Sequence, residues 1–281
     1  IGGDEDEVGG YTYATSDLAT IRARMRDYKP TKILYVVDVR QGLHFTQLFR
    51  AAALAGYCRE DQLEFLGIGT INNKDGKPFK TRSGGVMRLT DLLDLAYEAA
   101  AKKSGFDLTI SNHDPIVESI SVAALKFQDL RINRTMNYSF DPEAAIQHEG
   151  KTGPYIQYAA ARIQSILDKT KEGFPAYQQR NIILNTSEER ALCLKLLAYP
   201  DALAAAASWR SPSELCTYLY ETAQIFSNFY QQCPVLSPDL SEEISASRLQ
   251  IIAKTLNVIR ACATLLGFDL PERMPSTAQV I

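Results

Sequence analysis

The sequence predicts an α/β portion followed by an all-α portion. Short apolar runs alternate with helix-like segments in the front of the chain, which is typical of a parallel sheet. From residue 112 onward the pattern is helical almost throughout, with apolar residues at three- and four-residue spacing. Gly150, Gly153 and Pro154 interrupt the helical pattern, which indicates a boundary there. We therefore expect domains at 1–150 and 151–281.

The front portion is expected to hold two strands and three helices. Residues 32–38 form a continuous apolar run, which predicts a strand covered on both faces. A second strand is expected at 63–71. Helices are predicted at 18–27, with Asp17 or Ser16 as the cap, at 43–55 and at 86–101. Ligands of such sheets lie beyond the carboxyl ends of the strands, so the loops after both strands are candidate sites.

The second portion is expected to be an antiparallel helical bundle. Pro154 suits the first turn of a helix, and Gly267 followed by Pro271 ends the last one. The predicted helices are 112–130, 141–149, 153–169, 188–198, 200–208, 212–232 and 240–266.

Composition narrows the classes of function. The chain has 281 residues and a net charge of −3, so nucleic acid is not attracted by a global basic field. Five scattered cysteines without a CxxC pair argue against a zinc centre or a disulfide framework and favour a reducing compartment. No metal held by the protein and no membrane partner are expected. The acidic, glycine-rich start without methionine is interpreted as a cut inside a longer protein.

A basic glycine loop lies at residues 77–85. It suits a polyphosphate, because its cations neutralise phosphate charge and its glycines let backbone N–H groups approach oxygen. The helix expected next would turn its positive N-terminus toward the same anion. A solvated turn is the alternative. The residues of this loop that carry the hypothesis are Lys77, Lys80, Thr81, Arg82, Ser83 and Gly84.

Two pairs of residues near the strand ends are candidates for binding a small molecule. Tyr13 and Asp17, four residues apart across an expected strand-to-helix turn, would hold a cationic group, or Asp17 would only cap the helix while Tyr13 packs. Gln41 and His44 follow the first strand. Gln41 would bond a substrate amine or amide, and His44 would contact a base or phosphate or be structural.

Aromatic and basic residues of the second portion suggest contacts with RNA. Tyr155, Tyr158 and Arg162 share one helix face, a pattern that stacks unpaired bases, and a core role for the tyrosines is the alternative. Trp209 would be a core anchor or a stacking platform. A cluster at residues 131–141 would touch a phosphate backbone or tie the two portions together. Bundle packing is expected for Tyr218, Tyr220, Phe226, Phe229 and Tyr230.

Six motifs in order give the chain a family resemblance that covers nearly its whole length. It resembles arginyl-tRNA synthetase at GGYTYATSDLA (9–19), RQGLHF (40–45), KDGKPFKTRSGG (74–85), NRTMNYSFD (133–141), GPYIQYAAAR (153–162) and LLGFDLPERM (265–274). The resemblance implies a class I enzyme. Its front would be the second half of a Rossmann-type catalytic domain, and its back a helical anticodon-binding domain.

The resemblance also implies roles for single residues. Arginine would be held by Tyr13, Asp17 and Gln41, and ATP by His44 together with Lys80, Thr81, Ser83 and Gly84. Lys77, Lys80 and Arg82 would stabilise the charge that develops on the phosphates during catalysis. Tyr155, Tyr158 and Arg162 would contact the tRNA. The loop departs from the KMSKS form of class I enzymes because Ser83 replaces the second lysine, which leaves open whether Lys77 or Lys80 dominates.

The expected activity is ATP-dependent attachment of arginine to its tRNA, in the cytoplasm, with Mg²⁺ accompanying ATP. The expected partners are arginine tRNA, arginine and ATP, and a monomer is expected. The HIGH-type motif of class I enzymes is not found in the 281 residues, so the chain is expected to be a fragment that is inactive alone. The alternative is a catalytically silent module of the same family that binds tRNA or docks a partner.

Overall fold

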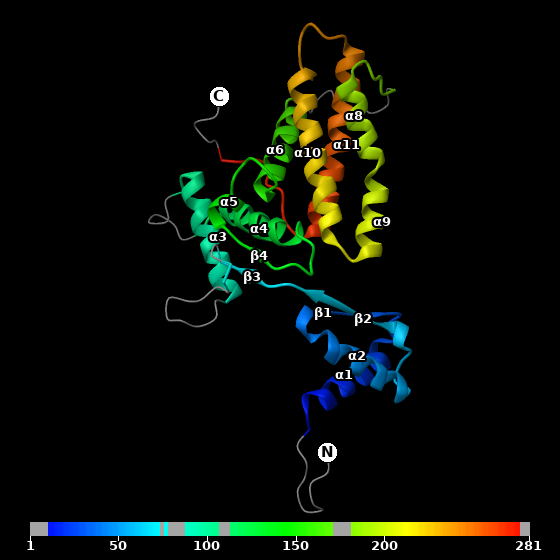
Figure 1. The fold of residues 1–281 in the computed structure, drawn as a ribbon. Coiled ribbons are helices and arrows are strands. Elements are labelled where there is room, and N and C mark those ends of the chain that lie inside the picture. The colour runs from blue at the N-terminus through cyan, green and yellow to red at the C-terminus, as the bar shows by residue number, and fades with distance from the viewer. Residues whose placement is uncertain (1–10, 74–75, 78–87, 107–112, 171–180, 276–281) are drawn as a thin grey trace, which may run out of the picture. The chain divides into compact units, whose positions relative to one another are not determined.

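The chain forms two compact units. The computed structural model describes residues 11–73, 76–77, 88–106, 113–170 and 181–275 (Figure 1). Unit 1 comprises Ile1–Thr70 and Arg134–Asn137, and unit 2 comprises Ile71–Asn133 and Tyr138–Ile281. This division falls at residue 70 because the helices that follow pack with the C-terminal helices. The domain boundary near residue 150 stays a prediction.

Unit 1 is a two-stranded parallel sheet with helices on one face. In chain order it contains α1 (Tyr13–Tyr28), β1 (Ile33–Asp38), η1 (Val39–Gln41), α2 (Gly42–Leu54), η2 (Glu60–Gln62) and β2 (Leu63–Ile68). The strands pair in register from Ile33 opposite Leu63 to Asp38 opposite Ile68, which confirms the predicted parallel arrangement. The core joins Ile21 of α1 and Leu48 of α2 to the strands.

The prediction that β1 is covered on both faces is wrong for the described structure. Exposure alternates along the strand, and the side chains of Leu34 and Val36 are exposed. Ile33, Tyr35 and Val37 pack against the core formed with α1 and α2. Figure 1 shows both helices on the same side of the two strands. A wholly apolar run conceals this alternation, because the exposed positions are as apolar as the covered ones.

The strand predicted at residues 63–71 is two strands. β2 ends at Ile68, and β3 (Ile71–Asn72) pairs in parallel with β4 (Tyr138–Ser139) in a second small sheet. Gly69 lies at the break, where a Cβ atom would come 2.2 Å from the carbonyl oxygen of Met136. Glycine is therefore required for the close approach of the two segments.

Unit 2 begins with three helices around a shared core. They are α3 (Leu89–Ser104), α4 (Pro115–Leu130) and α5 (Pro142–Ala145). Asp114 caps α4 by accepting hydrogen bonds from the N–H groups of Ile116 and Val117, and Pro115 occupies its first turn. The predicted helix at 141–149 is much shorter, because the chain leaves the helix at Ile146 and turns at Gly150, which has a φ of +75°.

In the described part of unit 2, five further helices pack around a larger core. They are α6 (Gly153–Asp168), α8 (Ser187–Leu197), α9 (Tyr199–Trp209), α10 (Pro212–Gln232) and α11 (Glu242–Leu266), which confirms the predicted elements within a few residues. Figure 1 shows them side by side. The chain is thus mostly helical with small parallel sheets, while the Rossmann-type arrangement of the front portion stays a prediction.

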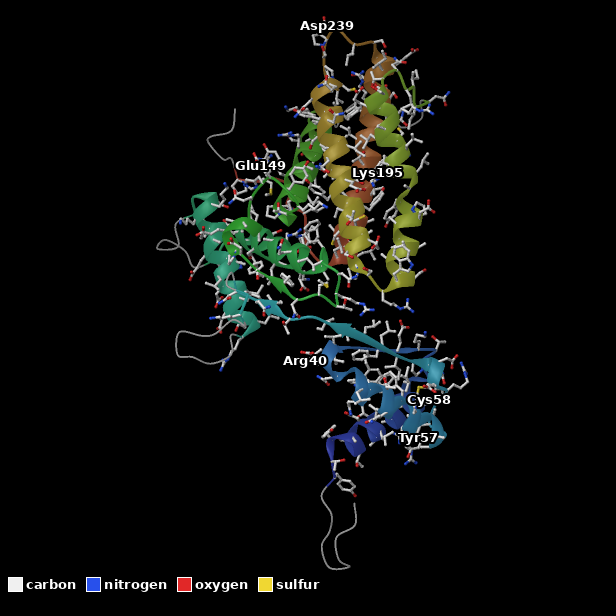
Figure 2. All side chains as sticks on the ribbon, in the orientation of Figure 1. Arg40, Tyr57, Cys58, Glu149, Lys195 and Asp239 are labelled. Carbon is white, nitrogen blue, oxygen red and sulfur yellow. The ribbon has the colours of Figure 1, made fainter. Side chains whose placement is uncertain are left out.

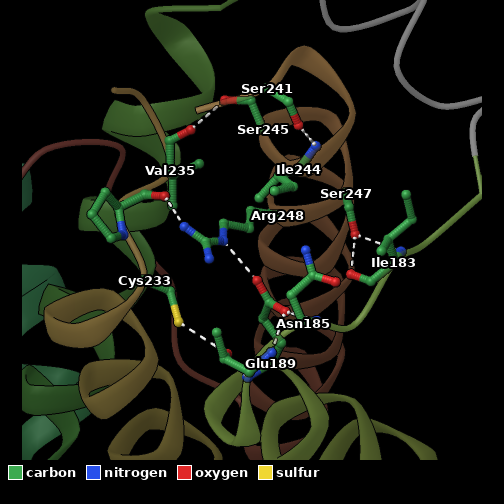
Figure 3. Close-up of polar contacts among 12 residues, drawn as sticks. Ile183, Asn185, Glu189, Cys233, Val235, Ser241, Ile244, Ser245, Ser247 and Arg248 are labelled. Carbon is green, nitrogen blue, oxygen red and sulfur yellow. Dashed lines mark hydrogen bonds and ion pairs between the residues drawn. The ribbon is translucent and has the colours of Figure 1, made fainter. Parts of the chain in front are cut away.

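A buried ion pair joins α8 to α11 (Figure 3). The Nε atom of Arg248 donates to Oε1 of Glu189 at 2.6 Å, and the two side chains are 7% and 1% exposed. The other oxygen of Glu189 accepts the backbone N–H groups of Asn185 and Thr186 at the start of α8. Arg248 also donates to the carbonyl of Pro234 at 2.6 Å. Both charges are therefore compensated and hydrogen-bonded.

Two helical stretches, residues 187–209 and 242–266, have the length and apolar composition of a membrane span. The second is largely buried in the bundle as α11, which explains its apolar character. The first is interrupted where α8 ends and Pro200 opens α9, and it is mostly exposed. Length and composition of this kind are weak indicators, because core helices have the same properties.

Candidate functional site

Three of the predicted site residues meet in unit 1. Nε2 of His44 and Oδ2 of Asp17 lie 2.9 Å apart, joining the first turn of α2 to α1. The ring of Tyr13 lies beside the ring of His44, with centroids 5.1 Å apart and an angle of 58° between planes. The Asp17 side chain is 43% exposed and that of His44 is 23% exposed. A phenol, a carboxylate and an imidazole thus form one accessible corner.

Asp17 does not cap its helix. Helix α1 begins at Tyr13, with Thr12 at the capping position, so Asp17 lies one turn inside. The expected start at residue 18 and the strand-to-helix turn between Tyr13 and Asp17 are therefore wrong. Because residues four apart share a helix face, the earlier start places both side chains on the side that meets His44.

Gln41 lies at the junction of η1 and α2, three residues before His44, and it is exposed. The turn before it is fixed by a pair that sequence reasoning missed: the guanidinium of Arg40 donates to both oxygens of Asp38, and Asp38 also accepts the backbone N–H of Arg40. These hydrogen bonds lower the pKa of Asp38 to about 2. Arg40 is labelled at this turn in Figure 2. An Asp two residues before an Arg at a strand end is the sequence signal that could have revealed this pair.

The predicted phosphate loop lies mostly outside the described residues. Lys77 is described and belongs to unit 2, where its backbone N–H and C=O both bond to Asn73 after a turn at Gly76. Helix α3 begins at Leu89, three residues later than predicted, and the carboxylate of Asp91 accepts the N–H of Arg88 there. The loop residues outside the described part are Lys80, Thr81, Arg82, Ser83 and Gly84.

The polar cluster at residues 131–141 makes hydrogen bonds to the end of β2 and to the residues that follow it. Arg134 donates to the carbonyl of Gly67 at 2.8 Å, and the side-chain oxygen of Asn137 accepts the N–H of Thr70 at 2.8 Å. These bonds lie within unit 1. They fix the chain at the break between β2 and β3. The sequence-based expectation was instead that this cluster would connect residues 1–150 to residues 151–281.

A second candidate surface lies on unit 2 at helices α6 and α10. The guanidinium of Arg162 lies 4.8 Å from the ring centroid of Tyr158 and 4.9 Å from that of Tyr230, and it donates to the Tyr158 hydroxyl at 3.1 Å. A pocket of about 330 Å³ opens beside it, lined also by Lys169 and Met274. Tyr158 is 36% exposed and Tyr230 38%. Exposed rings around a cation form a surface on which a base can stack.

Other aromatic residues divide between the core and the surface. Tyr155 packs on Tyr220, and its hydroxyl bonds Ser227, so it lies against the bundle and away from the Tyr158 pocket. The ring of Tyr230 packs on that of buried Phe226, with centroids 6.1 Å apart, as the packing prediction expects, but it is 38% exposed and also lines the pocket. Trp209 is exposed on α9. Tyr218, Phe226 and Phe229 are buried as predicted.

The described residues contain no group of three His, Cys, Asp or Glu side chains placed to hold a metal ion. All five cysteines are free. Burial raises the pKa of Cys216 and of Cys262 to about 12 each, which leaves both thiols protonated and unreactive.

Two family models match the chain. Residues 5–142 match the class I (R) tRNA synthetase catalytic domain, and residues 156–274 match the DALR anticodon-binding domain. The fold and these matches place the chain among the class I aminoacyl-tRNA synthetases. The chain is 44% identical over 273 residues to an arginine–tRNA ligase of Hyphomonas neptunium and 42% identical to one of Maricaulis maris. It belongs to the arginyl-tRNA synthetase family.

Solved structures agree with this assignment. The chain matches the arginyl-tRNA synthetase of Thermus thermophilus with a TM-score of 0.75 and 25% identity, over 95% of this chain and 50% of that one. The enzyme of Plasmodium falciparum gives a TM-score of 0.75 at 24% identity, which supports the fold. The matches with the two curated relatives cover 95% of this chain and 46% of each relative, so the chain spans about half their length.

Proposed function

We propose that the chain carries the guanidinium-binding corner and a tRNA-contacting surface of an arginine–tRNA ligase. The observation that carries the proposal is the corner of Tyr13, Asp17 and His44. A guanidinium offers a planar fork of donors, and a half-exposed carboxylate on a rigid helix accepts two of them side by side. A lysine ammonium would leave part of that geometry unmet, which accounts for selectivity. Gln41, exposed three residues before His44, would bond the amino group of arginine.

The proposed reaction has two steps. The carboxylate of arginine attacks the α-phosphorus of ATP, and pyrophosphate leaves. The 3′-terminal hydroxyl of tRNA then attacks the carbonyl carbon of arginyl-adenylate, and AMP leaves. No covalent protein nucleophile is required, so the protein acts by positioning and by charge stabilisation. Lys77, Lys80 and Arg82 would neutralise the phosphates, with Mg²⁺ accompanying ATP, and His44 and the loop residues Thr81, Ser83 and Gly84 are assigned to ATP by resemblance.

The Tyr158 pocket supports the tRNA part of the proposal. Arg162 is held between two rings, so its charge is fixed on a surface that also presents stacking faces. Lys169 lines the same pocket and adds positive charge for a phosphate backbone. Tyr155, which lies away from the pocket, would hold α6 against α10 through its packing on Tyr220.

The test of the arginine site is Asp17→Asn, which keeps the shape of the side chain and removes its charge. Arginine-dependent ATP–pyrophosphate exchange is measured in the presence of arginine tRNA for the chain within a protein of the relatives' full length. Loss of a charge-assisted pair is expected to raise the arginine KM by roughly 10- to 150-fold. Asp27→Asn, at an exposed ion pair with Arg26 on the same helix, is the matched control and should leave KM unchanged. An unaltered arginine KM in Asp17→Asn would refute the site.

The tRNA surface is tested by direct binding of arginine tRNA to the same protein. Arg162→Gln is expected to weaken binding by about tenfold, in line with the loss of one stacked contact. Arg260→Gln removes an exposed arginine from α11 and serves as the control. Equal affinities of the two variants would remove Arg162 from the interface. Retained tRNA binding without any arginine-dependent exchange would favour a silent tRNA-binding module.

A further inference from the structure

His44 holds the carboxylate of Asp17 from the neighbouring helix. The two residues are 27 positions apart in the sequence, and their 2.9 Å contact forms because α1 and α2 pack together through Ile21 and Leu48. The imidazole also contacts the rings of Tyr13 and Phe45, with ring centroids 5.1 Å and 5.2 Å away. It is the less exposed partner of the pair.

The direction of this hydrogen bond follows from chemistry. An ionised carboxylate can only accept, so Nε2 of His44 must carry the proton that it donates to Asp17. A carboxylate has about four lone-pair sites, and the imidazole occupies one of them. Among the hydrogen bonds of the described chain, none reaches Oδ1 of Asp17. The carboxylate is therefore oriented on one side and open on the other.

We propose that His44 is a positioning residue for arginine, which acts through Asp17 by holding its carboxylate ready for a guanidinium. This inference rests on the proposed function and deepens it. A half-exposed aspartate without such a partner samples several rotamers and must be ordered when the ligand binds. A pre-oriented carboxylate avoids that cost. The role differs from the ATP contact that the family resemblance implies for His44.

The test separates the KM for arginine from the KM for ATP in pyrophosphate exchange in the presence of arginine tRNA, using the protein of the relatives' full length. His44→Leu removes the donor, and His44→Gln places an amide N–H near the position of Nε2. We expect His44→Leu to raise the arginine KM about tenfold with the ATP KM within twofold, and His44→Gln to recover most of the loss. Gln47→Leu, exposed on the same helix, is the control and should change neither.

Two results would overturn the inference. One is a raised ATP KM with an unchanged arginine KM, which would place His44 on the nucleotide. The other is a glutamine variant no better than leucine, which would show that the N–H group does not matter. Circular dichroism spectra that match the parent protein show that the variants are folded, and His44→Gln remains informative if His44→Leu unfolds.

Asp17→Asn distinguishes failure of this inference from failure of the proposed function. If Asp17→Asn weakens arginine binding and His44→Leu does not, only the positioning role fails. If neither variant changes the arginine KM, the whole site fails. The double variant should lose no more arginine affinity than Asp17→Asn alone, because His44 acts through the carboxylate that this variant removes.

Discussion

Replacement of Arg248 by methionine should strongly destabilise unit 2. Methionine approximates the length of the side chain, but it leaves the carboxylate of Glu189 buried without its counter-charge and the carbonyl of Pro234 without its donor. Breaking a buried pair from one side costs about 3–5 kcal/mol. For a unit of this size that corresponds to a fall in Tm of roughly 6–20 °C.

The assay is urea unfolding followed by circular dichroism at 222 nm, with Arg260→Met as the control on the same helix. Arg260 is exposed, and its side chain donates a hydrogen bond to Gln164, so its loss should cost under about 0.5 kcal/mol. The double variant Glu189→Gln with Arg248→Met removes both charges while the amide oxygen still accepts the N–H of Asn185 or Thr186. It should be more stable than Arg248→Met alone. The reasoning would be refuted if Arg248→Met lowered the free energy of unfolding by less than about 1 kcal/mol. It would also be refuted if the loss in the double variant equalled the sum of the losses in the two single variants.

Two further predictions concern unit 2. Gly153→Ala should lower the free energy of unfolding by about 1–3 kcal/mol, because its Cβ would lie 2.2 Å from the carbonyl oxygen of Ala123 in α4. Urea unfolding measures this loss, and Gly42→Ala is the control because its Cβ would meet nothing nearer than 3.5 Å. Equal losses in the two variants would contradict the prediction. Burial, and secondly the charge of Lys103, lowers the pKa of His148 in the folded protein. As the pH falls below about 6.5, the unfolded state therefore binds a proton before the folded state does, and the free energy of unfolding decreases. The urea midpoint should therefore fall more between pH 7.5 and 5.5 in the parent protein than in His148→Gln, and parallel losses would contradict this.

The elements were predictable because most carry local signals. Pro115 and Asp114 mark the start of α4, and Gly267 marks the end of α11, so these bounds follow from capping chemistry. Helix α1 was missed at its start because Thr12 occupies the capping position without a side-chain hydrogen bond, whereas Asp17 has the better capping chemistry and uses it on His44 instead. The capping preference of Asp17 therefore did not set the start of the helix, and its side chain contacts His44 of α2 instead.

The candidate site was predictable in its residue types and not in its contacts. Tyr13, Asp17 and His44 were each singled out by type and position, but the bond between the last two depends on how α1 packs on α2, which no local pattern encodes. Tyr230 was expected to pack in the bundle, and its ring does contact Phe226, but it also lines the pocket beside Arg162. The contact of its ring with Arg162 of α6 joins two helices, so the spacing within α10 does not predict it.

The exposed position of Trp209 has a spectroscopic consequence. It is the single tryptophan of the chain, and its side chain is 64% exposed at the end of α9, a helix without a buried residue. Its emission in the native protein should already resemble that of a solvated indole, so intrinsic fluorescence will report little when the bundle melts. The same indole is a ready optical probe of any molecule that settles on the outer side of α9, because covering it would shift its emission to the blue.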